Sequence, residues 1–288
     1  MKLVSAEQFT LETLTHVYNE SRVDYIVPMP MSVGRMQEYI DLYDVDLDAS
    51  WVAVDGDEPV GLGMLGVRSD RAWITRIGVL PNGRRHGVGR ALTKALIQSA
   101  AKRELPVVWL EVIVGNRAAH QLFLVHGFEP TRELIVARRP PTLKGMVGDG
   151  DTLDPLTTRR VKPFGREGAL RLLRQRSERA NWLLETESLA NVGNLSALQV
   201  DFVDGSRGWV AFHLDRLMLS HIYVGVKRGE VTDVTVQLLS VLHGRYPTKD
   251  AITENLPAES NLWAGFQKAG YFDAFRRTEM VLHLPVTD

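Results

Sequence analysis

The spacing of apolar and polar positions predicts helices and then strands along the first part of the chain. Apolar residues recur at helical spacing before position 50, and Pro28 and Pro30 rule out one continuous helix there. After position 50 the period becomes that of strands, with Asp55-Gly56 as a hairpin turn. The predicted elements are helices over residues 10–21 and 33–43 and strands over residues 51–54, 59–67 and 73–80.

A turn with two glycines, Gly87 and Gly89, follows the third of these strands. Apolar spacing beyond it predicts a helix that ends before Pro106, and an apolar run over residues 107–114 predicts an interior strand. Asn116 is a candidate N-cap of a second helix, and Gly127 fits the left-handed position at its end. Residues 73–128 are therefore predicted to form strand, glycine turn, helix, strand and helix.

The glycine turn is predicted to bind a phosphate group. A strand that runs through a glycine-containing loop into a helix exposes several backbone N–H groups beside the positive end of the helix dipole. Gly87 and Gly89 suit this role because a Cβ there would block the approach of the phosphate or strain the turn. The turn alone does not identify the ligand.

Composition narrows the classes of partner. The 288 residues suffice for two domains, and the formal net charge of -1 gives no electrostatic case for nucleic acid or an anionic membrane. The chain has no cysteine, and its histidines do not show the spacing of metal ligands, so we expect no metal. The N-terminus lacks the apolar core of a signal peptide, and we expect a cytoplasmic protein.

The second half is predicted to repeat the fold of the first. Residues 138–165 are rich in proline and glycine, which indicates a linker. After it, a turn at Asp204-Gly205 matches Asp55-Gly56, and strands and helices recur in the same order. We predict one domain over residues 1–140, a linker over residues 141–164 and a second domain over residues 165–288. The expected fold class is α+β, with helices on both faces of a mixed, mostly antiparallel sheet.

Two motifs resemble those of the GNAT superfamily of N-acetyltransferases. The stretch Arg84-x-x-Gly87-x-Gly89 is similar to that family's Q/R-x-x-G-x-G/A loop, and Asn116-x-x-Ala119-x-x-Leu122-Phe123-x-x-x-Gly127-Phe128 is similar to its second motif. The resemblance covers residues 50–135 and implies a tandem arrangement whose second copy is degenerate. It also implies that the chain uses acetyl-CoA and transfers the acetyl group to a primary amine by direct attack.

The same resemblance implies which residues bind acetyl-CoA. The loop amides would surround the pyrophosphate, the preceding strand would hold the pantetheine arm through backbone groups, and the residue that begins the second helix would line the cofactor. A helix cap is a compatible alternative for Asn116, and simple solvation is an alternative for the arginine side chains. The implied cofactor-binding residues are Ile77, Gly78, Val79, Arg84, Arg85, His86, Gly87, Val88, Gly89, Arg90 and Asn116.

Glu111 is the candidate general base, because a primary amine is mostly protonated at neutral pH and must lose a proton before it attacks. It is a lone acid in an apolar strand, and it stands where ribosomal-protein alanine N-acetyltransferases, which this segment resembles, carry their catalytic glutamate. The alternative is a structural ion pair with an arginine such as Arg76. Many family members have a tyrosine that protonates the leaving thiolate where this chain has Phe123, which we interpret as a core residue.

The second copy is not expected to bind acetyl-CoA. Its loop over residues 225–232 lacks the paired glycines, and Glu230 and Asp233 place negative charge at the helix start, which opposes a pyrophosphate. We expect it to act as a scaffold, as a wall of the substrate pocket or as an internal replacement for a homodimer partner. Glu254 roughly matches Glu111 and is interpreted as a relic.

Two other functions use the same residues. A dinucleotide-dependent oxidoreductase is disfavoured because Leu92 replaces the third glycine and a meander precedes the loop. A non-catalytic acyl-CoA-binding regulatory or interaction protein is favoured by Phe123 and the degenerate copy. The acceptor, a small-molecule or peptide amine, does not follow from the fold, although residues 24–43 are expected to shape its pocket. We expect a monomer or a homodimer.

Overall fold

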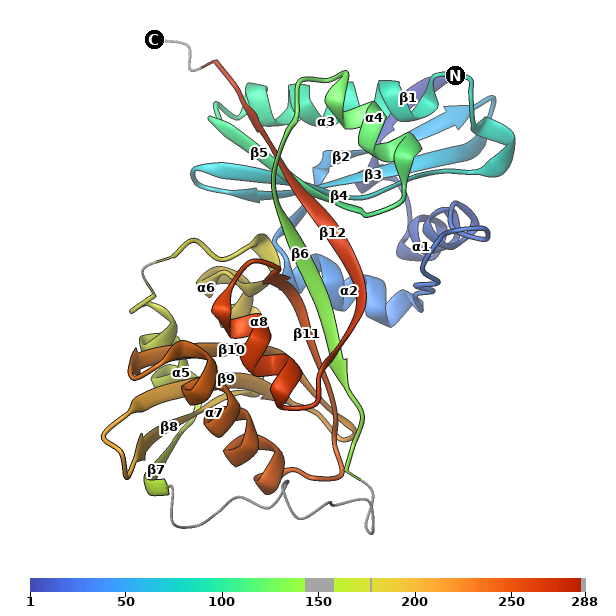
Figure 1. The fold of residues 1–288 in the computed structure, drawn as a ribbon. Coiled ribbons are helices and arrows are strands. Elements are labelled where there is room, and N and C mark those ends of the chain that lie inside the picture. Colours follow the sequence, from blue (N-terminus) through green and yellow to red (C-terminus); the bar gives the residue numbers. More distant parts are fainter. Residues whose placement is uncertain (143–157, 177, 286–288) are drawn as a thin grey trace. The chain divides into compact units, whose positions relative to one another are not determined.

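Two units, each a mixed β-sheet with helices packed against it, make up the computed structural model, which describes residues 1–142, 158–176 and 178–285 (Figure 1). Unit 1 comprises Met1–Arg132 and the C-terminal residues from Thr278 onward, and unit 2 comprises Glu133–Arg277. The predicted α+β class and the tandem arrangement are confirmed. Within the described ranges, no helix has both the length and the hydropathy that crossing a membrane requires.

Unit 1 begins with a short strand and two helices and continues as a meander, a helix, a strand and a helix. The elements are β1 (Lys2–Ser5), η1 (Ala6–Gln8), α1 (Leu11–Glu20), α2 (Val33–Leu42), β2 (Val45–Asp55), β3 (Glu58–Arg68), β4 (Arg71–Val79), η2 (Pro81–Gly83), α3 (Val88–Lys102), β5 (Val107–Ile113) and α4 (Arg117–Leu124). Side chains of Thr10, Ser32 and Asn116 accept hydrogen bonds from backbone N–H groups and begin α1, α2 and α4.

Unit 2 repeats this order. Its elements are β7 (Thr158–Phe164), α5 (Arg166–Leu173), η3 (Trp182–Leu184), α6 (Thr186–Asn191), β8 (Leu195–Phe202), β9 (Arg207–Leu214), β10 (Met218–Arg228), α7 (Val231–Arg245), β11 (Asp250–Pro257) and α8 (Asn261–Lys268). Residues 141–142 and 158–164 of the predicted linker are described, and the latter form β7, which pairs antiparallel with β8. The rest of that linker lies outside the described residues.

Two further strands, β6 (Glu129–Arg139) and β12 (Phe272–His283), each contribute residues to both units. Residues 133–139 of β6 belong to unit 2 and pair antiparallel with β11 there, whereas residues 278–283 of β12 belong to unit 1. The strand order is β1-β2-β3-β4-β5-β12 in unit 1 and β6-β11-β10-β9-β8-β7 in unit 2. Each repeat thus gives part of its last strand to the other unit. A division of the sequence at residues 140 and 165 does not include this exchange.

In unit 1, α3 covers one face of the sheet and α1 the opposite face (Figure 1). Glycines on β3 let α3 approach closely: a Cβ on Gly63 would lie 2.8 Å from Leu96, and one on Gly61 would lie 3.1 Å from Val88. The helix is thereby fixed directly over the strands that lead into the glycine turn. Gly127 has a φ of +87° and Phe123 packs on Phe128, as predicted for the end of α4.

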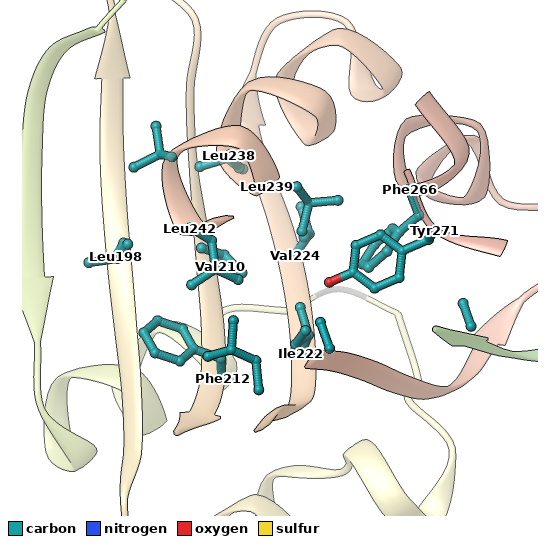
Figure 2. Packing of buried hydrophobic residues seen from close by; sticks show 14 of the residues in the cluster. Leu198, Val210, Phe212, Ile222, Val224, Leu238, Leu239, Leu242, Phe266 and Tyr271 are labelled. Carbon is teal, nitrogen blue, oxygen red and sulfur yellow. The ribbon is translucent and has the colours of Figure 1, made fainter. Parts of the chain in front are cut away.

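The core of unit 2 is a continuous apolar cluster between the sheet and its two later helices (Figure 2). Strand residues such as Phe212 and Val224 face leucines of α7, including Leu238, and Phe266 of α8 packs on Tyr271. The apolar side chains of α7 and α8 are therefore buried in one cluster with those of the strands. Unit 2 therefore has a continuous core, although its loop over residues 225–232 lacks the paired glycines of the matching turn in unit 1.

The packing of α8 on α7 predicts the effect of Gly265→Ala. A Cβ on Gly265 would lie 2.5 Å from Thr235 Cβ and 2.9 Å from the Thr232 carbonyl oxygen, so the two helices would have to separate. We expect a loss of about 1–3 kcal/mol in the free energy of unfolding, measured by urea denaturation.

Gly34→Ala is the matched control, because Gly34 is also helical but has no neighbouring atom within 4 Å of such a Cβ. It should be neutral or stabilise the fold by up to about 1 kcal/mol. Equal destabilisation by the two substitutions would contradict the packing argument.

Candidate acetyl-CoA and transfer site

An opening between β4 and β5 is the structural basis of the candidate site. The two strands pair in parallel from Ala72↔Val108 to Ile74↔Leu110, and no pairing of these strands is described beyond that point. Arg76 has a φ of +50°, and the register between β3 and β4 shifts once across it, between the pairs Met64↔Thr75 and Leu62↔Gly78, which marks a β-bulge. The bulge lies just beyond Ile74, the last β4 residue described as paired with β5, so the following strand edge has no described partner strand.

The glycine turn places backbone amides at the start of α3. Arg85 and Gly87 both have positive φ values, +66° and +81°, so two backbone positions just before the helix are in the left-handed conformation. Gly87 is the N-cap but offers no side-chain hydrogen bond, and the N–H groups of the first helical turn are left to a ligand or solvent. A Cβ on Gly87 would have open space, so its backbone conformation, and not a neighbour, requires glycine there.

The predicted loop residues differ in exposure. Arg85, His86 and Arg90 are exposed around the uncapped helix start, whereas Val88 is buried under the sheet. A Cβ on Gly89 would make only ordinary contact, 3.4 Å, with Leu122. Any need for glycine at position 89 would therefore have to come from a ligand.

The matching turn in unit 2 carries its own anion. The Glu230 carboxylate accepts a hydrogen bond of 2.8 Å from the Asp233 N–H and caps α7. Hydrogen bonds from the backbone at Asp233 and Thr232 hold the pKa of Glu230 below its ordinary value. The first turn of α7 thus has the side-chain acceptor that the first turn of α3 lacks. The negative charge predicted at the start of α7 is present.

Arg84 bridges the glycine turn to the residues that follow α1. Its guanidinium donates to both carboxylate oxygens of Asp24, at 2.5 and 2.7 Å, and also to the Ser21 and Val79 carbonyl oxygens. These hydrogen bonds lower the pKa of Asp24, so the pair is ionised at neutral pH. The Arg84 side chain, predicted to be a phosphate ligand or merely solvated, is engaged within the protein.

The predicted pantetheine strand, Ile77 to Val79, lies against the same segment. Arg22 donates from Nη2 to the Ile77 carbonyl oxygen at 3.2 Å, and a Cβ on Gly78 would lie 2.2 Å from Ser21 Oγ. Gly78 is therefore a glycine because Ser21 approaches it closely. Residues 21–26, which we call the crossing segment, already contact the strand edge that the resemblance assigns to the cofactor.

Asn116 has two hydrogen-bonding roles at the start of α4. Its Oδ1 accepts from the Ala119 N–H at 3.1 Å, which confirms the predicted cap. Its Nδ2 points the other way and donates to the Tyr25 hydroxyl at 3.4 Å. The crossing segment thus reaches from the end of β4 to the start of α4.

Glu111 is half-buried in β5 and accepts a hydrogen bond of 2.7 Å from Trp73 Nε1. Tyr39 lies nearby: burial raises its pKa to about 12, the Arg76 charge opposes that rise and the Glu111 charge adds to it. The Arg76 guanidinium lies 3.9 Å from the centre of the Tyr39 ring. Glu111, the candidate base, and Arg76, its alternative ion-pair partner, thus both lie near the Tyr39 side chain.

Phe123 is buried and packs edge-on against Phe128, with ring centres 5.8 Å apart. Its interpretation as a core residue is confirmed. In unit 2, Glu254 accepts a hydrogen bond of 2.8 Å from Arg277. The residue that roughly matches Glu111 is therefore engaged in an ion pair with Arg277 of β12.

Sequence reasoning missed Ser21, Arg22 and the role of Tyr25. The predicted acceptor region began at residue 24, and the three residues after α1 carry no motif. Arg22 stood out in the sequence as a charged residue between the first helix and the aromatic stretch. Its role was not predictable, because it donates to the Ile77 carbonyl oxygen, 55 positions away. Within the described ranges, no three His, Asp or Glu side chains form a group that would hold a metal ion.

Comparisons with known proteins bear on the family and the fold of this chain. Residues 14–128 match the acetyltransferase (GNAT) family. The chain is also similar to the [ribosomal protein bS18]-alanine N-acetyltransferase of Escherichia coli K12, at 42% identity over 59 residues. That match covers 20% of this chain and 40% of the relative, so the chain spans less than half the length of the curated relatives it matches.

Solved structures show the same fold over the whole chain. A tandem GNAT protein from the clavulanic acid biosynthesis pathway aligns with a TM-score of 0.66 at 15% identity, covering 100% of both chains. A GCN5-related N-acetyltransferase from Sphaerobacter thermophilus aligns with a TM-score of 0.65 at 16% identity, covering 96% of this chain and 93% of that one. Residues 14–128 therefore carry the match to the acetyltransferase (GNAT) family, and the fold of the whole chain is similar to that of a tandem GNAT protein.

Proposed function

We propose that the chain is an acetyl-CoA-dependent N-acetyltransferase that works by direct attack of a primary amine, with the chemistry in unit 1. The observation that carries this proposal is the uncapped start of α3 beside the opening between β4 and β5. The two features lie in sequence on one strand–turn–helix unit. Together they offer a site for a phosphate at one end of a ligand and a space for its acyl end at the other.

The turn fits a pyrophosphate. Backbone N–H groups over residues 85–90 and the positive end of α3, which is 15 residues long, attract negative charge. Arg85 and Arg90 are exposed beside these amides and add charge attraction. The other predicted ligands, from Ile77 to Val79 and at Asn116, lie along the opening.

The second unit is proposed to bind no acetyl-CoA. The Glu230 carboxylate already accepts the hydrogen bond that a phosphate would need, and Asp233 adds charge of the same sign. We assign this unit a structural role, since its β6 residues and the β12 residues of unit 1 make each sheet depend on both repeats. The active form therefore requires the full chain.

Glu111 is proposed as the general base. Its carboxylate is half-buried and held by Trp73 Nε1, which fixes its position on β5 next to the opening. Removing a proton from the ammonium form of the acceptor frees the lone pair that attacks the thioester carbon. Trp73 orients the base without neutralising it, because its indole N–H has no charge.

A non-catalytic acyl-CoA-binding protein is the second candidate, and the burial of Phe123 favours it. The two functions separate in a single assay. Release of CoA from acetyl-CoA on addition of an amine requires the enzyme, whereas binding without release requires only the binding protein. The panel of amines should include polyamines, amino acids and a peptide that begins with alanine, since a curated relative acts on a ribosomal-protein alanine.

Gly87→Glu tests the cofactor site. The substitution forces a side chain onto a φ of +81° and adds negative charge at the helix start, so acetyl-CoA affinity should fall at least about 100-fold. Acetyl-CoA should raise the melting temperature of the wild-type chain and leave that of Gly87→Glu unchanged.

Glu230→Gln is the control in the other unit and should leave the affinity unaltered, and titration calorimetry should find one site per chain. A second site, or a normal acetyl-CoA response from Gly87→Glu, would refute the assignment.

Glu111→Gln tests the base. Glutamine can still accept from Trp73 Nε1, so the fold and the acetyl-CoA affinity should persist, whereas turnover near neutral pH should fall about 10²- to 10⁴-fold. The loss should shrink as pH rises, because a larger share of the amine is then already deprotonated. Unchanged turnover at pH 7 would remove Glu111 from the mechanism.

A further inference from the structure

We propose that Tyr25 is the proton donor to the CoA thiolate and that Asn116 is its positioning residue; this rests on the function proposed above. Position 123, where the family resemblance places such a donor, holds a buried phenylalanine without a hydroxyl. The transfer nevertheless produces a thiolate that must be protonated. The phenol of Tyr25, on the crossing segment, is placed to replace the missing group.

The cap of α4 decides which way the hydrogen of Tyr25 points. Asn116 Oδ1 accepts from the Ala119 N–H, so the other end of the same amide is the NH₂ group. That group donates to the Tyr25 hydroxyl oxygen, which is therefore the acceptor in this pair. The phenolic hydrogen is left over, and within the described part of the chain no hydrogen bond from it is found. The arrangement presents a donor without a protein acceptor.

The crossing segment places this hydroxyl across the opening. It contacts β4 at Gly78 through Ser21, and it contacts the β5–α4 junction at Gly115, where a Cβ would lie 4.0 Å from Ile26. Tyr25 lies between these two contacts and is half-buried. A thioester that entered the opening between β4 and β5 would therefore meet this segment.

Two other tyrosines of this region, Tyr18 and Tyr39, do not offer a comparable hydrogen. Tyr18 is fully buried and already donates to the Met29 carbonyl oxygen at 3.0 Å. Tyr39 is buried and shares a 2.5 Å hydrogen bond with Thr75, and burial raises its pKa to about 12. Tyr25 is partly exposed, and its hydroxyl oxygen is held by the hydrogen bond that it accepts from Asn116 Nδ2.

The proton balance of the step is complete. Glu111 takes one proton from the ammonium form of the acceptor, and the freed lone pair forms the nitrogen–carbon bond. The carbon–sulfur bond then breaks with its electron pair on sulfur, and sulfur takes the phenolic proton. The second proton of the nitrogen is released to solvent as the amide forms. The Tyr25 phenolate is then reprotonated by solvent. Two positive groups would stabilise the negative charge of this phenolate. The positive end of the α4 dipole lies at Asn116, and the Arg22 guanidinium lies 5.3 Å from the centre of the Tyr25 ring.

Tyr25→Phe in the full chain tests the proposal. With the most active amine of the panel, kcat should fall about 100-fold, while the rise in melting temperature caused by acetyl-CoA stays that of the wild type. The decline of kcat at alkaline pH that a phenol donor imposes should disappear. Val23→Ala, at an exposed position of the same segment, should leave kcat within twofold.

Asn116→Asp provides a second, independent variant. Aspartate can still cap α4 by accepting from the Ala119 N–H, but it has no NH₂ group and would itself accept the phenolic hydrogen. We expect the same fall in kcat, and the double variant Tyr25→Phe/Asn116→Asp should be no slower than either single one. This non-additivity is the signature of one shared role.

The outcomes separate the two proposals. No acetyl-CoA response and no CoA release from the wild type would overturn the proposed function and this inference with it. An active wild type with full turnover in Tyr25→Phe across the pH range would overturn the inference alone. Equal losses of kcat and of acetyl-CoA affinity in Tyr25→Phe would also overturn it, because they would indicate a purely structural role.

Discussion

The separation of β4 from β5 beyond Ile74 is the constraint on which the rest of the site depends. It requires Arg76 in a left-handed conformation that costs a non-glycine residue about 1–2 kcal/mol. The surrounding aromatic residues compensate this cost, since the guanidinium donates to the Tyr18 hydroxyl and lies over the Tyr39 ring. His221 in β10 has the same positive φ with a similar register shift. The opening is therefore a property of the repeated fold, and both copies retain it.

What distinguishes the two copies is the charge at one helix start. From the bulge to the helix cap the chain takes eleven steps in unit 1, from residue 76 to 87, but only nine in unit 2, from 221 to 230. The shorter turn in unit 2 brings a carboxylate onto the first amides of α7, which satisfies them internally. The longer turn in unit 1 ends in Gly87, which cannot do so. A difference of two residues and one side chain thus separates a helix start without a side-chain cap from a self-capped helix.

Much of the fold was predictable because its determinants are local. The period of apolar residues, the cap at Asn116 and the left-handed Gly127 gave the elements of unit 1 and their order. The exchange of β6 and β12 between units was not predictable, because strand pairing over more than a hundred residues leaves no periodic signal. Arg84 illustrates the same limit at the site: the motif placed it at the phosphate turn, while its partner Asp24 is 60 positions away. Sequence spacing identifies the loop, and only the structure identifies what the loop is tied to.

The Arg84–Asp24 pair joins the two halves of the proposed chemistry. Both side chains are more than a third exposed, 37% and 60%, so the pair contributes little to stability. Its effect is on position: Arg84 begins the phosphate turn, and Asp24 directly precedes Tyr25 in the crossing segment. The first residue of the glycine motif thus connects the glycine turn to the segment that carries the proposed acid, because its guanidinium is held by the Asp24 carboxylate.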